Sequence, residues 1–82
     1  MGILVREQKA LLARSIDIAV EQGEIAAFQL TRKLRIGFLQ AWSLVQEMEK
    51  LGVIIAEEGV TIRRCRISKE ELKRRRDRGE LP

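Results

Sequence analysis

The fold is decided by residues 29–51, which read QLTRKLRIGFLQAWSLVQEMEKL. Leu30 and Leu34 lie four residues apart, so both fall on one face of a short helix that we predict over Gln29–Arg35. An isoleucine-glycine step then interrupts the apolar pattern and allows a tight turn. A longer helix is predicted over Phe38–Leu51. Two short helices around a tight turn are typical of a helix-turn-helix.

The longer helix has two distinct faces, because successive residues of a helix turn by about 100°. Gly52 is placed to cap its end in the left-handed conformation. The apolar arc, which we expect to face the core, holds Phe38, Ala41, Leu44, Val45, Met48 and Leu51. The opposite arc, which a helix-turn-helix offers to the DNA major groove, holds Leu39, Gln40, Ser43, Gln46, Glu47 and Lys50.

Two further elements precede this unit. Apolar residues three, four and five apart predict a helix over Arg6–Gln22, and Gly23 is a suitable stop. Ile25–Phe28 is short and apolar, which favours one brief strand.

A β-hairpin is predicted after the unit, from a strand over Val53–Ala56, a turn at residues 57–59 and a second strand over Val60–Ile67. We expect Val60 and Ile62 to face inward, with Cys65 or Ile67, and Thr61, Arg63 and Arg64 to point out. A hairpin in this position is the wing of a winged helix.

The last predicted element is a charged helix. Ser68-x-x-Glu71 has the pattern of a capping box, which predicts a helix over Lys69–Arg78. Its side chains are nearly all charged and only Leu72 is apolar, so we expect no broad packed face and a helix that frays.

The sequence therefore predicts an α+β fold that is mostly α: a winged helix-turn-helix with a three-helix core and a short β-hairpin wing, followed by a basic C-terminal helix. We expect the winged domain to occupy residues 1–67 and the basic helix and tail to occupy residues 68–82. One compact unit is what a chain of 82 residues supports.

Composition excludes several function classes. Hydrophobic residues make up 45% and charged residues 34%, which is typical of folded proteins. There is no histidine, and Cys65 is the only cysteine, so a zinc finger is excluded and we expect no metal site. Cys65 itself is expected to act as a small strand hydrophobe. No phosphate loop or catalytic set is present, so we predict a binding module that is not an enzyme and needs no cofactor. No apolar run approaches the ~18 residues that span a bilayer, so we expect no membrane partner and a cytoplasmic protein.

The positive charge is concentrated toward one end. Residues 1–59 hold seven Lys/Arg against eight Asp/Glu, whereas residues 60–78 hold nine Lys/Arg against three Asp/Glu. A basic end on a near-neutral body favours a polyanionic partner, because released counterions drive such contacts. The alternative is a solvated tail that only aids solubility. The run Arg74-Arg75-Arg76 is open to three readings: it lies along DNA, binds RNA or remains free.

The stretch from Leu30 to Val53, and above all the heptapeptide RKLRIGF at 32–38, resembles the gamma domain of the FtsK/SpoIIIE DNA translocases. The resemblance extends over about residues 10–67. It implies a small winged helix that reads short G-rich polarity sequences in the chromosome and so sets the direction of DNA pumping. The chain starts with its own methionine and has no ATPase motor, so we expect either an excised domain or, as the favoured reading, a stand-alone protein.

The recognition helix departs from the family. Where the family has Tyr-Asn-Arg-Ala-Ala-Arg, this chain has Phe38-Leu39-Gln40-Ala41-Trp42-Ser43. Gln40 can pair with an adenine edge and Leu39 can contact a thymine methyl, whereas the Asn and Arg of the family are types that reach base edges by hydrogen bonds.

The predicted partner is double-stranded DNA. Base reading is assigned to Leu39, Gln40 and Ser43 on the long helix, and backbone contacts to cations at the turn and in the wing. The full set of predicted DNA-binding residues is Arg32, Lys33, Arg35, Leu39, Gln40, Ser43, Arg63, Arg64 and Arg66.

The alternative function is protein binding, as a dimeric adaptor or an inhibitor. Its predicted interface holds Leu39 and Trp42, with Ile3 and Leu4 as part of a homodimer seam. Trp42 lies on the shoulder between the two arcs. It packs on the first helix or the wing, joins Leu39 in an exposed patch, or stacks on nucleic acid. Exposure of Leu39 and Trp42 together favours the protein partner.

Overall fold

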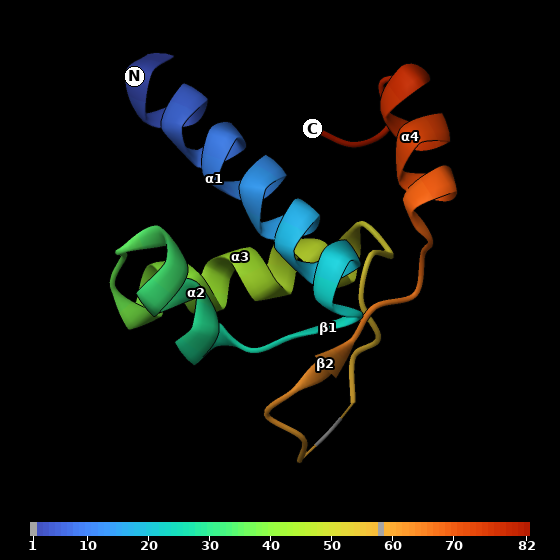
Figure 1. Cartoon of the computed structure of the whole chain (residues 1–82). Coiled ribbons are helices and arrows are strands. Elements are labelled where there is room, and N and C mark those ends of the chain that lie inside the picture. Colours follow the sequence, from blue (N-terminus) through green and yellow to red (C-terminus); the bar gives the residue numbers. More distant parts are fainter. Residues whose placement is uncertain (1, 58) are drawn as a thin grey trace.

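The computed structural model describes residues 2–57 and 59–82, with side chains from residue 7 onward apart from residue 58. Figure 1 shows the long α1 crossing above α3, with α2 beside the first turns of α3 and α4 at the opposite side of the molecule. The elements in chain order are α1 (Gly2–Gln22), β1 (Glu24–Ile25), α2 (Ala27–Leu34), α3 (Phe38–Lys50), β2 (Arg63–Arg64) and α4 (Lys69–Asp77). This order confirms the predicted winged helix, which is mostly helical and has a small antiparallel sheet.

The core lies where the first three helices meet. The predicted inner face of α3 is confirmed for four of its six members, Ala41, Leu44, Val45 and Met48, which are all buried. α1 adds Ile16 and Ala19, and α2 adds Leu30 and Leu34. Leu51 is half-buried just after α3. The prediction was wrong for Phe38, which is 60% exposed because it opens the helix directly after Gly37, beyond the reach of the core.

The turn between α2 and α3 has an unusual residue at its start. Arg35 caps the end of α2 with φ of 54°, in the left-handed region that glycine usually occupies. α2 itself begins at Ala27, two residues earlier than predicted, because the backbone N–H of Ala26 donates to the Gln29 side chain over 3.1 Å. The strand predicted over Ile25–Phe28 was therefore wrong at its end, and β1 covers Glu24–Ile25.

The wing is less regular than the predicted hairpin. β2 pairs antiparallel with β1, with Ile25 opposite Arg63. In the segment after α3, Ile54 forms an antiparallel bridge with Cys65, the residue directly after β2. The strand predicted over Val60–Ile67 thus contributes only its middle. The predicted facing was wrong for Val60 and Ile62, which are exposed, and for Arg63, which turns inward. It is confirmed for the buried Ile67 and for the exposed Thr61 and Arg64. The pairing with β1 sets the register, and β1 presents Ile25 to the core.

The final helix packs against the rest of the domain, and its expected fraying stays a prediction. Leu72 in α4 and Leu81 after it are both buried in the core cluster. Glu71 N–H donates to Ser68 Oγ over 3.1 Å, so the predicted N-terminal cap is present. The Glu70 pKa is lowered by its own backbone N–H and by the Ser68 hydroxyl. In the described part of the chain no helix has the length and apolar character to cross a membrane.

Candidate nucleic-acid interface

The outer face of α3 is the first part of the candidate site. Leu39, Ser43 and Gln46 are four and three residues apart, so they form one exposed row along the helix. Leu39 is 80% exposed, more than any other large hydrophobic residue in the described part of the chain. Buried α3 residues on the opposite face fix this orientation. We call Leu39, Ser43 and Gln46 the outer row.

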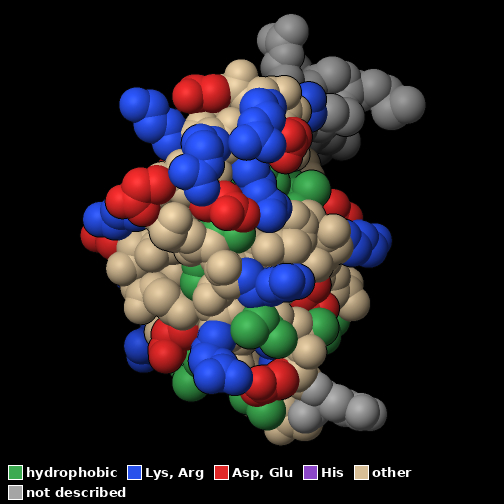
Figure 2. Space-filling model, turned by 90° about the vertical axis from the view of Figure 1, so that its right-hand side faces the viewer, with side chains coloured by type: hydrophobic (Ala, Val, Ile, Leu, Met, Phe, Trp, Pro, Cys, Tyr) green, Lys and Arg blue, Asp and Glu red, His purple; other side chains and the backbone are tan. Residues whose placement is uncertain are grey.

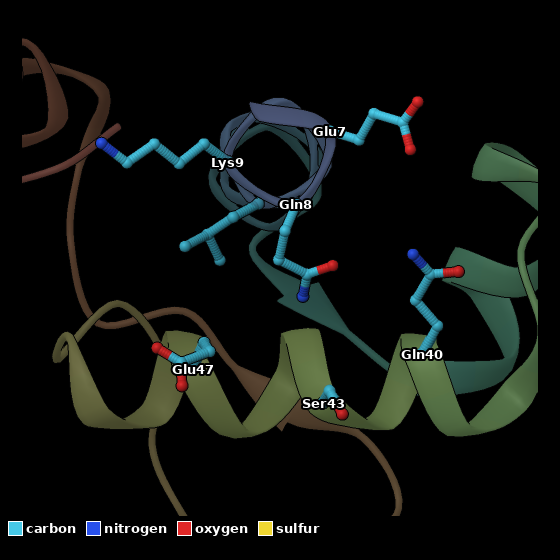
Figure 3. Close-up of a pocket in the computed structure, with 7 residues that line it drawn as sticks. Glu7, Gln8, Lys9, Gln40, Ser43 and Glu47 are labelled. Atoms are coloured by element: carbon cyan, nitrogen blue, oxygen red, sulfur yellow. The ribbon is translucent and has the colours of Figure 1, made fainter. Parts of the chain in front are cut away.

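Gln40 lies beside the outer row and faces a groove between α3 and the N-terminal half of α1. The groove has a volume of about 590 Å³. Figure 3 shows Gln8 of α1 and Gln40 of α3 directed toward the space between the two helices, with Ser43 and Glu47 further along α3. The predicted reading residues therefore divide: Leu39 points to open solvent, Gln40 borders the groove, and Ser43 belongs to both surfaces.

Three basic residues cluster at the end of α2, next to the start of α3. Arg32, Lys33 and Arg35 are all exposed. The Lys33 ammonium donates to Gln22 Oε1 over 2.6 Å, which ties it to the end of α1. Arg32 and Arg35 have no ion pair within the part of the chain that the structure describes. Their charges are therefore available to a phosphate backbone.

The arginines of the wing strand divide into one inner and two outer residues. The Arg63 side chain is only 11% exposed, and its Nε donates to Glu49 Oε1 over 2.9 Å. Arg64 and Arg66 are exposed, and Arg64 pairs with Glu57 over 3.0 Å in a solvated ion pair. Such a surface pair contributes little to stability and can exchange for a phosphate at small cost. The structure thus brings Arg64 and Arg66 to the surface and places Arg63 inside.

Trp42 packs against the wing strand, which is one of the three arrangements considered for it. The Arg63 guanidinium carbon lies 5.8 Å from the Trp42 ring centroid, within cation–π range. Trp42 keeps 37% of its surface exposed and is flanked by the exposed Phe38 and Leu39. The side chains of Ile3 and Leu4, the predicted dimer seam, lie outside the described residues, and so does Glu58 in the predicted turn.

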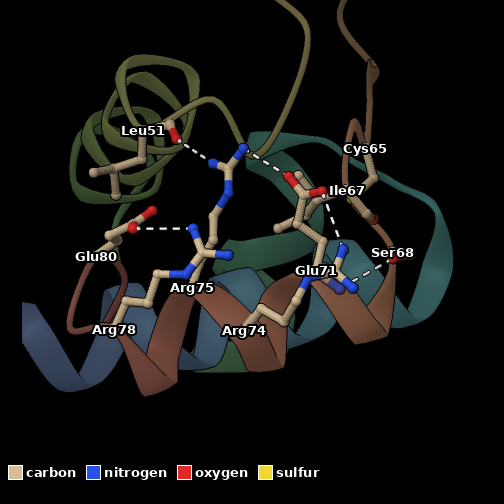
Figure 4. Close-up of polar contacts among 9 residues, drawn as sticks. All are labelled: Leu51, Cys65, Ile67, Ser68, Glu71, Arg74, Arg75, Arg78 and Glu80. Carbon is tan, nitrogen blue, oxygen red and sulfur yellow. Dashed lines mark hydrogen bonds and ion pairs between the residues drawn. The ribbon is translucent and has the colours of Figure 1, made fainter.

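The basic C-terminal helix folds back on the domain. Figure 2 shows Lys and Arg side chains gathered over the upper part of the molecule, where α4 lies, interleaved with acidic ones. Figure 4 shows Arg75 reaching the Leu51 carbonyl, at 3.2 Å, and the Glu71 carboxylate, at 2.7 Å. Arg76 bonds to Asp17 Oδ1 over 2.7 Å and to the Ala13 carbonyl over 3.2 Å. Arg75 and Arg76 are therefore held within the molecule, while the exposed Arg74 pairs, among the described residues, only with Glu71, at 3.7 Å.

Sequence reasoning placed Gln46 on the outer arc but did not single it out as a site residue. Its spacing of seven from Leu39 was the available signal, because residues at i and i+7 share a helix face. The sequence near Arg63 does not show that its side chain turns inward, because this orientation depends on the pairing of Arg63 with Ile25 of β1. Among the residues that the structure describes, no three acidic or cysteine side chains come together as a metal-ion site would need.

Comparison with known proteins independently supports the family resemblance predicted from the sequence. The family model described as the FtsK gamma domain matches residues 6–68. The DNA translocase FtsK of Caldanaerobacter subterraneus subsp. tengcongensis is 30% identical over 71 residues, which is 87% of this chain and 10% of that protein. The DNA translocase FtsK of Clostridium tetani is 33% identical over 66 residues, 80% of this chain and 9% of that protein.

The chain thus spans about a tenth of the length of these relatives. No solved structure matches it significantly. The family match includes the whole helix-turn-helix and the wing strand, and it ends at Ser68, directly before α4. The predicted resemblance is confirmed, and the chain belongs to the FtsK gamma domain family.

Proposed function

We propose that this chain binds double-stranded DNA through α3 and the wing and catalyses no reaction. In this proposal it acts in the cytoplasm as a DNA-sequence-recognition module or a transcriptional regulator. The observation that best supports this proposal is the exposed outer row of α3. Arg32 and Arg35 lie at the start of this helix, and the wing strand lies at its side. The relatives are named DNA translocases, which supports DNA as the ligand.

The proposed DNA contacts divide by chemistry. Arg32, Arg35, Arg64 and Arg66 would bind phosphates, because they are exposed guanidinium groups and phosphate contacts supply sequence-independent affinity. Lys33 would join them after leaving Gln22. The outer row, with Gln40 at its edge, would face the bases. Arg63 would act indirectly in this proposal, by holding the wing strand against α3.

The test is fluorescence anisotropy with the whole chain and a mixed-sequence duplex of about two helical turns, titrated at several salt concentrations. We expect binding that weakens log-linearly with salt, with a slope that changes by about 0.9 for each phosphate that a variant no longer neutralises. Arg64→Ala combined with Arg66→Ala should lower the slope by about 1.8 and weaken all duplexes equally. Absence of binding at low salt would contradict the proposal.

A matched control removes two charges elsewhere. Arg14→Ala with Arg78→Ala takes the same net charge from α1 and from the residue that ends α4. This variant should retain most of the salt slope of the unmodified chain. If the two double variants behave alike, binding depends on net charge alone and the docking through the wing is wrong.

The exposed apolar residues at the start of α3 favour a second candidate function. Phe38 and Leu39 are largely exposed beside Trp42, as a protein-binding or homodimeric surface would require. Light scattering at tens of micromolar tests the dimer: a dimer mass that Leu39→Glu returns to the monomer would support it. A monomer mass for the unmodified chain would count against it.

A further inference from the structure

The outer row of α3 holds no cation for reading guanine. The helix reads FLQAWSLVQEMEK, so its only basic residue is Lys50 in the last turn, where the ammonium lies 3.6 Å from the Glu47 carboxylate. Guanine is recognised mainly by Arg or Lys at O6 and N7. The outer row of Leu39, Ser43 and Gln46 therefore lacks the group that guanine needs.

Leu39 offers an apolar contact in the same place. It stands in the first turn of α3, is 80% exposed, and is flanked by the exposed Phe38. In the major groove the one strongly apolar feature of a base pair is the C5 methyl group of thymine. Contact with that methyl removes apolar surface of both partners from water. Leu39 thus fits thymine better than any other base.

Gln46 offers the matching polar contact. It lies on the outer row two turns beyond Leu39, and its exposed amide has both a donor and an acceptor. Such an amide matches the N6 and N7 groups of adenine. Gln40 carries the same amide, but its side chain is directed toward the α1 groove (Figure 3).

We infer that α3 reads A·T base pairs, with a thymine methyl against Leu39 and an adenine edge on Gln46. This inference rests on the proposed DNA binding and names its target. It departs from a G-rich target, because the helix carries the chemistry for methyl and adenine recognition and lacks the cations for guanine.

The experiment begins with selection of bound duplexes from a random pool by the whole chain. We expect selected sites that hold A·T pairs at fixed positions. Thymines of the selected site are then replaced one at a time by uracil, which removes only the methyl group. The critical replacement should weaken binding about fourfold, as the loss of one buried methyl predicts. Leu39→Ala should bind the thymine and uracil probes equally.

Two controls make the result specific. Uracil placed outside the selected site should leave affinity unchanged. For the polar contact, 7-deazaadenine should weaken binding of the unmodified chain roughly tenfold at one position and leave Gln46→Ala unaffected. Lys50→Ala is the matched variant in the last turn of the same helix and should still discriminate between adenine and 7-deazaadenine. All three positions are exposed, so these variants should fold normally.

Other outcomes overturn the inference in distinguishable ways. Selection of G-rich sites, or a uracil series without effect, shows that Leu39 does not read a methyl group, while duplex binding itself stands. Salt-dependent binding with no selected sequence also overturns the inference and leaves the proposed function in place. Failure to bind any duplex removes both, and the apolar start of α3 then belongs to a protein partner.

Discussion

Arg63 of the wing strand donates from Nε to Glu49 Oε1 of α3 over 2.9 Å, and this ion pair joins the wing to α3. Both side chains are largely buried, with 11% and 22% exposed. The guanidinium also lies over the Trp42 ring, and its Nη1 is buried with no hydrogen-bond partner among the described residues. The ion pair therefore holds the wing against α3 and keeps the Arg63 side chain buried.

Loss of one partner should destabilise the fold. Arg63→Met should lower the free energy of unfolding by about 2–3 kcal/mol, because it leaves the Glu49 carboxylate partly buried and unpaired. Trp42 is the only tryptophan of the chain and touches the site, so its fluorescence reports urea unfolding directly. Arg63→Met with Glu49→Leu should recover most of the loss, since an apolar pair needs no charge partner.

A solvated ion pair on the same helix supplies the control. The side chains of Lys50 and Glu47 are 75% and 46% exposed at a separation of 3.6 Å. Lys50→Ala should change the free energy of unfolding by less than about 0.5 kcal/mol. If Lys50→Ala and Arg63→Met change the free energy of unfolding equally, burial of the Arg63–Glu49 ion pair does not stabilise the fold.

α4 should depend on a single arginine for its attachment to α1. Arg76 donates to Asp17 Oδ1 and to the carbonyls of Ala13 and Pro82, with the bonds to Asp17 and Pro82 both at 2.7 Å. Arg76→Ala should cost about 1–2 kcal/mol in the free energy of α4 detachment. Native-state hydrogen exchange should show faster exchange of the α4 amides and little change in α3.

The neighbouring Arg74 is the matched control for this helix. Its side chain is mostly exposed and reaches only Glu71, at 3.7 Å. Arg74→Ala should leave α4 exchange within about 0.5 kcal/mol of the unmodified chain. If both variants release α4 equally, Leu72 and Leu81 hold the helix without help from the Arg76 bonds.

The fold could be predicted because its signals are local. The three and four spacing of Ala41, Val45 and Met48, and the turn glycine before α3, determine the helix-turn-helix from adjacent residues. The wing could not be predicted in detail, because its register depends on pairing between Ile25 and Arg63, which are far apart in the chain. A one-residue change of register reverses which side chains face the core.

The candidate site, too, could be predicted only in part from the sequence. The exposure of Leu39 and Ser43 follows from their place opposite the buried stripe of α3. The burial of Arg63 does not, because it requires Glu49 and Trp42 on another element as partners. The docking of α4 was missed for a related reason: arginine bonds to distant carbonyls leave no hydrophobic period in the sequence.

Acid should loosen the start of α4. The Glu70 pKa is lowered from 4.5 in the folded chain by its backbone N–H and the Ser68 hydroxyl. This carboxylate therefore stabilises α4 fully above pH 4.5, and the contribution is lost as the pH falls through the lowered pKa. Hydrogen exchange of the first α4 amides should accelerate over that range. Glu70→Gln should remove this pH dependence, and an unchanged pH profile in that variant would assign the effect to another carboxyl group.

Arg35 should lower the free energy of unfolding of the chain and raise its affinity for DNA. It holds φ of 54° at the end of α2, a conformation that costs a residue with a side chain roughly 1 kcal/mol relative to glycine. Arg35→Gly should therefore raise the free energy of unfolding by about 0.5–1 kcal/mol, because the strain that it relieves exceeds the added chain entropy of glycine. The same variant should lower the salt slope of duplex binding by about 0.9, since one phosphate is then left without its exposed cation.

Arg35→Asn, which also tolerates this conformation, separates backbone strain from charge: it should reproduce the reduced slope with a smaller gain in stability. If Arg35→Gly is more stable and binds DNA with an unchanged slope, the arginine is not part of the interface.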